Sequence, residues 1–353
     1  MDRELDEVSV VIAGSEFRFW TSATITTAID QFSTVRLVAP FEAERYEFRE
    51  TFRPFTFKTF DTLIGGAKAF TGTLVDVMPS VEPDTSTVEV TAYAKPAALV
   101  DCTMPGASVP LEFKGVGLRA ITAALLSPFG LDGPVFECGA VEGTRFKKEA
   151  LEVDEKIHSF LVKLAQQRGL IINDTTDGAL RYWRSVSTGT PVAHFKIGEQ
   201  PLVKIAASFS PQEFYSELTG FSEGKRGKPD GGRYRVPNPW LTDVVRPCSF
   251  RVDDTDPGDL PTATKAKAGR MFGAMAGFVL QDIPTWRDPQ GDLWRYNTTV
   301  MVTAPKVMIY RPTEMLVRGV ELSVEKEKRT AALELVLPGS FSGEMPERLP
   351  WME

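Results

Sequence analysis

Residues 70–93 read FTGTLVDVMPSVEPDTSTVEVTAY, and this stretch decides the fold class. It begins with an apolar run, which a segment rich in Pro, Ser and Asp interrupts at 79–85. Val88, Val90 and Ala92 then alternate with polar residues. Because successive side chains of a strand leave opposite faces of a sheet, this period of two predicts half-buried antiparallel strands. We therefore predict a strand pair here and a chain built mainly from strands.

Similar patterns precede this pair. Short apolar–polar alternations occur at 8–12, 34–38 and 55–60. Gly14 and the Gly65-Gly66 dipeptide favour tight turns between them, because glycine adopts a positive φ at little cost. We expect residues 1–97 to form a first small antiparallel β-barrel or sandwich.

The period changes after residue 97. Apolar residues recur at helical spacing from Leu118 and again from Ile157, and Gly169 follows Arg168 as a glycine often follows the last residue of a helix. The Asp177-Gly178 dipeptide then predicts a hairpin. These signals indicate a compact α+β domain over residues 98–185.

Strand patterns return in the last part of the chain. We assign 186–223 and 286–340 to a second β-barrel, 224–285 to a strand–helix–strand insertion, and 341–353 to a C-terminal tail. Within the insertion, 224–239 is rich in Gly, Pro, Lys and Arg, which predicts a mobile loop without regular structure. The two barrels are similar in pattern, but the identity between them does not prove a duplication. The predicted fold class is mainly β with α+β inserts.

Composition bounds the function. A chain of 353 residues predicts two or three domains, and a hydrophobic fraction of 42% with a charged fraction of 25% is typical of a globular protein. The formal net charge of −7 argues against nucleic-acid binding. The three cysteines have no metal-site spacing and suit a reducing compartment. The acidic N-terminus is unlike a signal peptide, and no apolar run is long enough for a membrane span, so we expect synthesis in a cytoplasm.

No catalytic constellation stands out. His158 and His194 are the only histidines, and neither has a nucleophile or carboxylate at a motif spacing. We expect His158 on the exposed side of its helix and His194 at the start of a strand, as solvent or edge histidines. The acidic segment 253–256 lacks the Gly and Glu of a calcium loop, so a solvated loop is favoured over a cation site. The basic residues of 224–239 lack a phosphate-binding motif. We predict no active site, cofactor or metal, although a spatial pair of carboxylates for glycoside hydrolysis stays open.

Several segments, in order, resemble one known family. They lie at 57–101, 161–180, 243–251, 286–294 and 333–341. Together they resemble the baseplate hub protein of contractile-tailed phages of the phage Mu type, also called tail protein D or the 43 kDa tail protein. The motif residues that we single out for a structural role are Gly65, Gly66, Gly72, Asp76, Asp101, Arg168, Gly169, Asp177, Gly178, Trp286, Asp288, Gly291 and Trp294.

The resemblance implies a homotrimer with two tube-like barrels in each subunit. Such a trimer presents a pseudo-sixfold ring, which could join a hexameric tail tube to a trimeric spike and line the channel between them. The implied partners are the spike or puncturing protein, the tail tube or distal tube protein and other baseplate proteins. The implied location is the virion, after synthesis in the host cytoplasm. DNA would pass through the lumen without specific binding, and an acidic lumen would suit that passage.

Three alternatives remain. One is the hub of a related contractile secretion particle; those hub proteins continue into a needle, which this chain would have to obtain as a separate partner. The second is a tail-associated cell-wall glycosidase. The third is a carbohydrate-binding β-sandwich, suggested by six Trp and seven Tyr. Trp286 and Trp294 are favoured as core or interface anchors rather than as sugar-binding residues.

Overall fold

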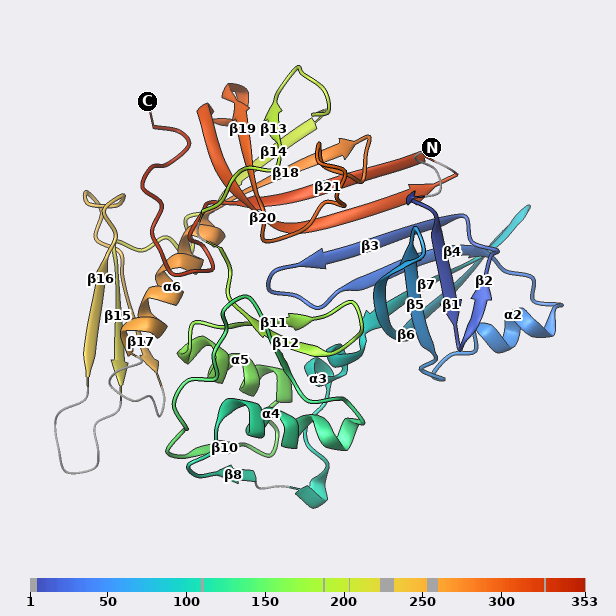
Figure 1. The fold of residues 1–353 in the computed structure, drawn as a ribbon, viewed down its shortest axis with the longest axis horizontal. Helices are drawn as coiled ribbons and strands as arrows, with labels where there is room; N and C mark the ends of the chain where they lie inside the picture. Colours follow the sequence, from blue (N-terminus) through green and yellow to red (C-terminus); the bar gives the residue numbers. More distant parts are fainter. Residues whose placement is uncertain are drawn as a thin grey trace.

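The computed structural model, drawn in Figure 1, describes residues 5–108, 111–186, 188–202, 204–222, 232–252, 260–326 and 328–352. Most strands belong to one 13-stranded sheet. An α+β domain lies beneath this sheet, and a three-stranded sheet with a long helix lies beside it (Figure 1). The predicted class, mainly β with α+β inserts, is confirmed.

The first half of the large sheet comes from the N-terminal part of the chain. Its strands lie in the order β2-β1-β5-β6-β7-β4-β3, and all neighbours are antiparallel. Their bounds are β1 (Val8–Ile12), β2 (Ser15–Phe17), β3 (Ser22–Ala28), β4 (Thr34–Pro40), β5 (Thr59–Ile64), β6 (Ala67–Glu82) and β7 (Thr85–Ala94). The short helix α2 (Tyr46–Thr51) follows β4 and places Phe48 in the core.

The second half comes from the C-terminal part. Its strands lie in the order β14-β18-β21-β20, and β19 pairs with both β20 and β13. Their bounds are β13 (His194–Lys196), β14 (Lys204–Phe209), β18 (Ala276–Ile283), β19 (Thr299–Ala304), β20 (Ile309–Glu325) and β21 (Lys328–Val336).

The two halves contain the same five-strand unit. In chain order and in pairing, β3, β4, β5, β6 and β7 correspond to β14, β18, β19, β20 and β21. We call these sets the first unit and the second unit. The correspondence extends to single bonds, because Leu74 N–H donates to the Lys58 carbonyl and Val317 N–H donates to the Thr298 carbonyl, each at 2.8 Å.

The two long hairpins also share their register. β6 shifts against β7 between Leu74 and Asp76, and β20 shifts against β21 between Val317 and Gly319. From each shift to the hairpin turn the segments read DVMPSVE at 76–82 and GVELSVE at 319–325. Four of these seven positions are identical, including the Ser-Val-Glu at the end. The duplication that sequence patterns left open is therefore supported by topology, register and sequence together.

A single strand pairing joins the two units. β20 pairs antiparallel with β3 from Gly319↔Ala28 to Glu325↔Ser22. Val320, Leu322 and Val324 on β20 are at most 6% exposed there. We call this pairing the internal junction. It makes the two units one continuous sheet with one shared hydrophobic core.

The α+β domain has a core of its own. It is built around α4 (Leu118–Leu126) and α5 (Ile157–Gln167), whose apolar faces bury Leu118, Ile121, Phe160 and Leu164. Its other elements are α3 (Ala98–Asp101), β8 (Leu111–Phe113), β9 (Val135–Phe136), β10 (Glu149–Leu151), β11 (Ile171–Asp174) and β12 (Leu180–Trp183). The predicted hairpin at Asp177-Gly178 joins β11 to β12.

An insertion follows β14. It contains a small sheet in the order β16-β15-β17, which packs on the long helix α6. The bounds are β15 (Glu217–Ser222), β16 (Arg233–Pro237), β17 (Pro247–Val252) and α6 (Leu260–Met275). Within the described part of the chain, no helix has the length and apolarity that a membrane crossing requires.

Three expectations need correction. The described strand pairings form an open path, so each unit is a curved part of one sheet rather than a closed barrel. β16 occupies 233–237, within the segment 224–239 that we expected to lack regular structure; residues 223–231 lie outside the described residues. The inserted segment also starts earlier and ends earlier than 224–285, because β15 belongs to the small sheet whereas β18 belongs to the large sheet.

Replacing Gly72 tests the packing of the first unit. A Cβ at this position would lie 2.2 Å from the Tyr93 carbonyl oxygen and 2.4 Å from the Phe70 ring. We expect Gly72→Ala to lower the free energy of unfolding by about 2–3 kcal/mol, because the close-packed interior must shift. Denaturant unfolding measures the loss. Gly133→Ala is the control, since nothing lies within 4 Å of its Cβ; equal stability of the two variants would contradict this account.

Candidate functional site

The described residues contain no group of three or more His, Cys, Asp or Glu side chains that could hold a metal ion. The cysteines are free thiols. His158 is half-buried against the Phe32 ring, at 5.1 Å between ring centroids, and burial lowers its pKa. We expected this imidazole to be exposed, so its position is a correction; His194 is exposed on β13 as expected. The acidic segment 253–256 lies outside the described residues.

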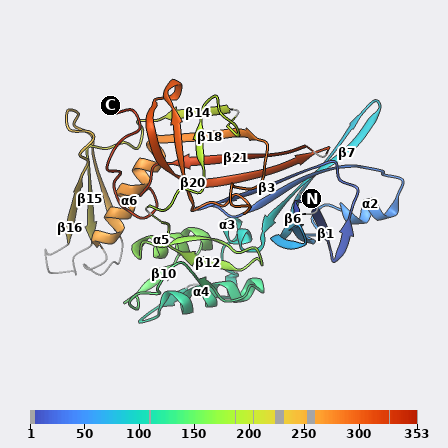
Figure 2. The same ribbon diagram turned by 45° about the horizontal axis from the view of Figure 1, so that its top comes forward.

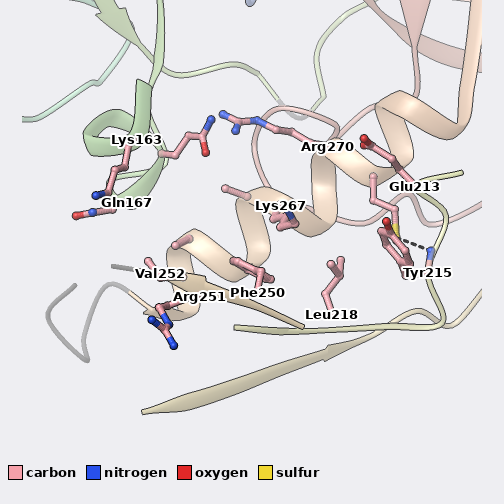
Figure 3. A pocket seen from close by; sticks show the side chains of 14 residues that line it. Lys163, Gln167, Glu213, Tyr215, Leu218, Phe250, Arg251, Val252, Lys267 and Arg270 are labelled. Carbon is pink, nitrogen blue, oxygen red and sulfur yellow. Dashed lines mark hydrogen bonds between the residues drawn. The ribbon is translucent and has the colours of Figure 1, made fainter. Parts of the chain in front are cut away.

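One groove lies between α5, α6 and the small sheet (Figure 3). Its volume is about 470 Å³. Arg270 reaches from α6 toward α5, and Lys267 lies over the Phe250 ring with its Nζ 4.8 Å from the ring centroid. Burial lowers the pKa of Arg270. Glu213 is the single carboxylate among the lining residues. The groove therefore lacks the carboxylate pair that a glycoside hydrolase uses.

A second group of polar residues connects the α+β domain to both units. Asn173 donates from Nδ2 to the Ala28 carbonyl of β3 and to the Tyr296 hydroxyl, each at 3.1 Å. Arg181 donates to Asn173 Oδ1 at 2.9 Å and to the hydroxyl of Tyr296. Asp174 accepts a 2.7 Å hydrogen bond from Ser33 N–H. We call these side chains the interdomain network.

Asp174, Arg181 and Tyr296 of the interdomain network line a cavity, together with the acidic residues Asp132, Glu137 and Asp177. Two carboxylates in one cavity are the arrangement that a glycoside hydrolase uses, so the contacts of these acids matter. Glu137, however, accepts from Arg181 at 3.0 Å, and the Asp174 carboxylate is directed at the Ser33 backbone. Burial raises the pKa of Asp174 against the opposing effect of the Ser33 hydrogen bond. Because these contacts fix the position of a domain, we interpret the network as structural.

The most prominent exposed features are two open sheet edges. The second half of β6, from Asp76 to Glu82, pairs with β7 alone among the described strands, and β14 pairs with β18 alone. The β6–β7 hairpin projects beyond the rest of the first unit (Figure 2). Val81 is 80% exposed and Phe209 on β14 is 43% exposed. Long apolar edges of this kind are uncommon on a free protein, because they template pairing with other chains.

Exposed aromatic residues lie next to the β6 edge. Phe55 and Phe57, between α2 and β5, are 87% and 60% exposed. Both have a positive φ, 62° and 47°, which costs a residue with a Cβ. Asn297, at the corresponding place before β19, also has a positive φ of 63°. The backbone shape is thus shared by the two units, whereas the exposed rings belong to the first.

The motif residues predicted from sequence are spread over the molecule rather than gathered at one site. Several form turns with positive φ: Gly65 and Gly66 between β5 and β6, Gly169 after α5, Gly178 between β11 and β12, and Gly291. Gly72 and Asp76 lie on β6, Asp101 ends α3, and Asp177 lies in the β11–β12 turn. Their structural role stays a proposal.

The remaining motif residues fix loops to strands. Trp286 and Trp294 donate from Nε1 to the carbonyls of Thr330 and Thr285, each at 2.9 Å, and both rings are buried as expected. Asp288 accepts from the N–H groups of Gln290 and Asp292. Arg168 donates to the Thr144 carbonyl at 2.9 Å.

Sequence reasoning missed the residues that join the parts. Asn173, Asp174, Arg181 and Tyr296 were not singled out, although Asn-Asp after two isoleucines is a polar interruption of a buried strand. The sequence also contains Ser-Val-Glu at both 80–82 and 323–325, and this repeat could have indicated the duplication.

Known proteins share this architecture. Residues 96–183 match a family model described as baseplate hub protein gp44-like, second domain. No match was found among curated proteins. The 43 kDa tail protein of prophage MuSo2 from Shewanella oneidensis is similar, with a TM-score of 0.77 at 23% identity over 95% of this chain and 99% of that chain. The expected resemblance to Mu-type baseplate hub proteins is confirmed.

Two further solved structures are similar. A tail protein from Neisseria meningitidis MC58 gives a TM-score of 0.77 at 16% identity, covering 95% of this chain and 98% of that chain. A component of the type VI secretion system of E. coli gives a TM-score of 0.55 at 11% identity, covering 93% and 76%. At these identities the likeness establishes a shared fold.

The buried carboxylate of Asp174 predicts a pH effect. Its folded-state pKa is raised, so the native state binds the proton more tightly than the unfolded state does. The free energy of unfolding should therefore fall as the pH rises from the ordinary carboxyl range to the raised pKa. Asp174→Asn keeps the acceptor for Ser33 N–H and should remove this fall. Denaturant unfolding at a series of pH values measures it.

Two controls accompany this variant. Asp174→Ala leaves the buried Ser33 N–H without its acceptor and should cost about 1–3 kcal/mol at every pH. Asp177→Asn changes an exposed carboxyl of the neighbouring turn and should leave the pH profile unchanged. If the free energy of unfolding of Asp174→Asn falls with pH as steeply as that of the wild type, the Asp174 carboxylate does not cause the effect.

Proposed function

We propose that this chain is the structural hub of a phage or prophage tail baseplate. Three copies would form a pseudo-sixfold ring that joins a hexameric tail tube to a trimeric central spike. The observation that carries the proposal is the presence of two five-strand units with the same topology and hairpin register in one continuous sheet. The family match of residues 96–183 and the shared fold with phage tail proteins support it.

Symmetry limits how rings of different order can meet. A ring closes when each subunit meets the next through the same rotation, so a trimer contacts all six subunits of a hexamer in the same way only if it offers six comparable segments. One chain here supplies two such segments, and the internal junction already fixes their relative position. A trimer would therefore offer six near-equivalent segments to the tube and three equal surfaces to the spike.

The face of the sheet opposite the core would line the channel. Along the strands from β14 to β6, and apart from the irregular positions, the described acidic residues of this face are Asp76, Glu82, Glu89, Glu314, Glu321, Glu325 and Glu334, and the basic ones are Arg36, Lys68, Lys204 and Lys328. Arg36 is neutralised by a two-bond contact with Glu89. A surface with an excess of carboxylates repels phosphates, so DNA could pass without binding.

The other assignments follow from the same role. The spike, the tail tube or distal tube protein and other baseplate proteins would be partners, and the protein would be part of the virion after synthesis in the host cytoplasm. Neither catalysis nor a cofactor belongs to this role. The shared fold with a type VI secretion component favours a second candidate, the hub of a related contractile secretion particle.

The mass in solution tests this proposal. Light scattering over a range of concentrations should give three times the chain mass of 39.0 kDa. Negative-stain images should then show a ring with a central channel. A species that stays monomeric at all concentrations would contradict the ring.

A digestion assay with purified bacterial cell walls tests the enzyme alternative. We expect no release of reducing sugar, because Arg181 engages the Glu137 carboxylate and the Ser33 backbone engages that of Asp174. Release that disappears in Glu137→Gln would favour a glycosidase and contradict the purely structural role.

A further inference from the structure

We infer that the open edge of β6 in one copy pairs with the open edge of β14 in a second copy, in the register that β20 and β3 use at the internal junction. The inference rests on the proposed function and specifies the surface through which the ring closes. Because of the duplication, β6 corresponds to β20, and β14 corresponds to β3. The pairing between copies is therefore a repeat of one that already exists within the chain.

On both open edges, the residues that would have to bond across the interface point their backbone N–H and C=O groups outward. Phe41 N–H donates to its register partner, the Ser86 carbonyl, at 2.9 Å. Because bonded and non-bonded pairs alternate in an antiparallel ladder, the N and O atoms of residues 77, 79 and 81 point away from β7. Ser210 N–H donates to the Met275 carbonyl at 2.8 Å, so residues 205, 207 and 209 likewise point away from β18.

At the internal junction, the corresponding residues point their backbone groups toward the partner strand. Ile29 N–H donates to the Arg318 carbonyl at 2.8 Å, which turns residues 320, 322 and 324 of β20 toward β3. These are the positions that correspond to 77, 79 and 81. The two open edges thus offer the same alternation of donors and acceptors as the strands that already pair.

The correspondence predicts a register between copies. Transferring the pairs of β20 with β3 gives the following partners: Val77↔Phe209, Met78↔Ser208, Pro79↔Ala207, Ser80↔Ala206, Val81↔Ile205 and Glu82↔Lys204. Pro79 has no N–H, so the ladder would lack one donor at this position. Proline is tolerated here because β6 is an edge strand of the single chain at this position.

The side chains fit this register. At the internal junction Val320, Leu322 and Val324 are buried, whereas the corresponding Val81 is 80% exposed in the single chain. A groove of about 320 Å³ beside Val77 and Pro79 is lined largely by apolar residues, among them Phe41 and Phe52. Phe209 of the second copy, opposite Val77, is the aromatic side chain placed to enter it. On the other face, Glu82 meets Lys204, a pair of opposite charge.

Cysteine cross-linking tests the register. Ser80 and Ala206 are predicted to be a directly opposed, non-hydrogen-bonded pair, whose short Cα separation suits a disulfide. Oxidation of Ser80→Cys/Ala206→Cys should give covalent dimers and trimers. The control Ser80→Cys/Ser208→Cys places the thiols diagonally, beyond disulfide reach, and should give about tenfold less product. Each single variant measures the background from the three native thiols.

The outcomes separate this inference from the proposed function. A trimer by light scattering without the in-register cross-link would overturn the pairing and leave the hub role standing. Preferential cross-linking of the diagonal pair would overturn the register. A protein that stays monomeric and does not cross-link would contradict both.

Substitutions at the edge give an independent test. Val81→Asp places a carboxylate where the register buries an apolar side chain and should raise the trimer dissociation constant about 100-fold. Val141→Asp, at a residue 63% exposed on the α+β domain, is the matched control and should leave it unchanged. Glu82→Lys should weaken the trimer about threefold, and adding Lys204→Glu should restore it. Equal effects of the two valine variants, or no rescue by the charge swap, would count against the pairing.

Discussion

The antiparallel pairing of β20 with β3 is the constraint on which the rest of the architecture depends. Seven consecutive residue pairs hold β20 of the second unit against β3 of the first. Because these strands are distant in sequence, their pairing makes one sheet and one core out of two units that could otherwise have folded apart. The acceptor for Asn173, the Ala28 carbonyl, lies at one end of this same pairing. The α+β domain is thus placed by the junction as well.

The interdomain network explains why that domain takes one position. Hydrogen bonds from Asn173 and to Asp174 reach the first unit, and Arg181 with Tyr296 reaches the second. Buried polar groups contribute little net stability, but they penalise every arrangement that leaves them unpaired. An apolar contact of equal area would allow the domain to slide. The network therefore fixes the orientation of the α+β domain more than it adds to the stability of the domain contact.

Local signals in the sequence predicted much of the fold. The alternation at 88–92, the turn at Asp177-Gly178 and the helical stripe from Ile157 all specify structure through neighbours in the chain, and each forms as expected. The errors concern partners that are distant in sequence. β18 joins the large sheet through β21 and β14, and β16 is a strand because β15 lies beside it. The interdomain network was harder still to predict, because Asn173 and Tyr296 acquire a role only when two parts of the chain meet.

The internal junction also affects the kinetics of ring assembly. Its two strands are tethered, so they meet at the high effective concentration that a linker provides, whereas the same pairing between separate chains depends on protein concentration and must offset the lost translational freedom. Half of the seams of a closed collar would therefore be complete as soon as each polypeptide has folded. Nucleation would then be limited by the seams between chains, which leaves the timing of assembly open to control by the partner that gathers the copies.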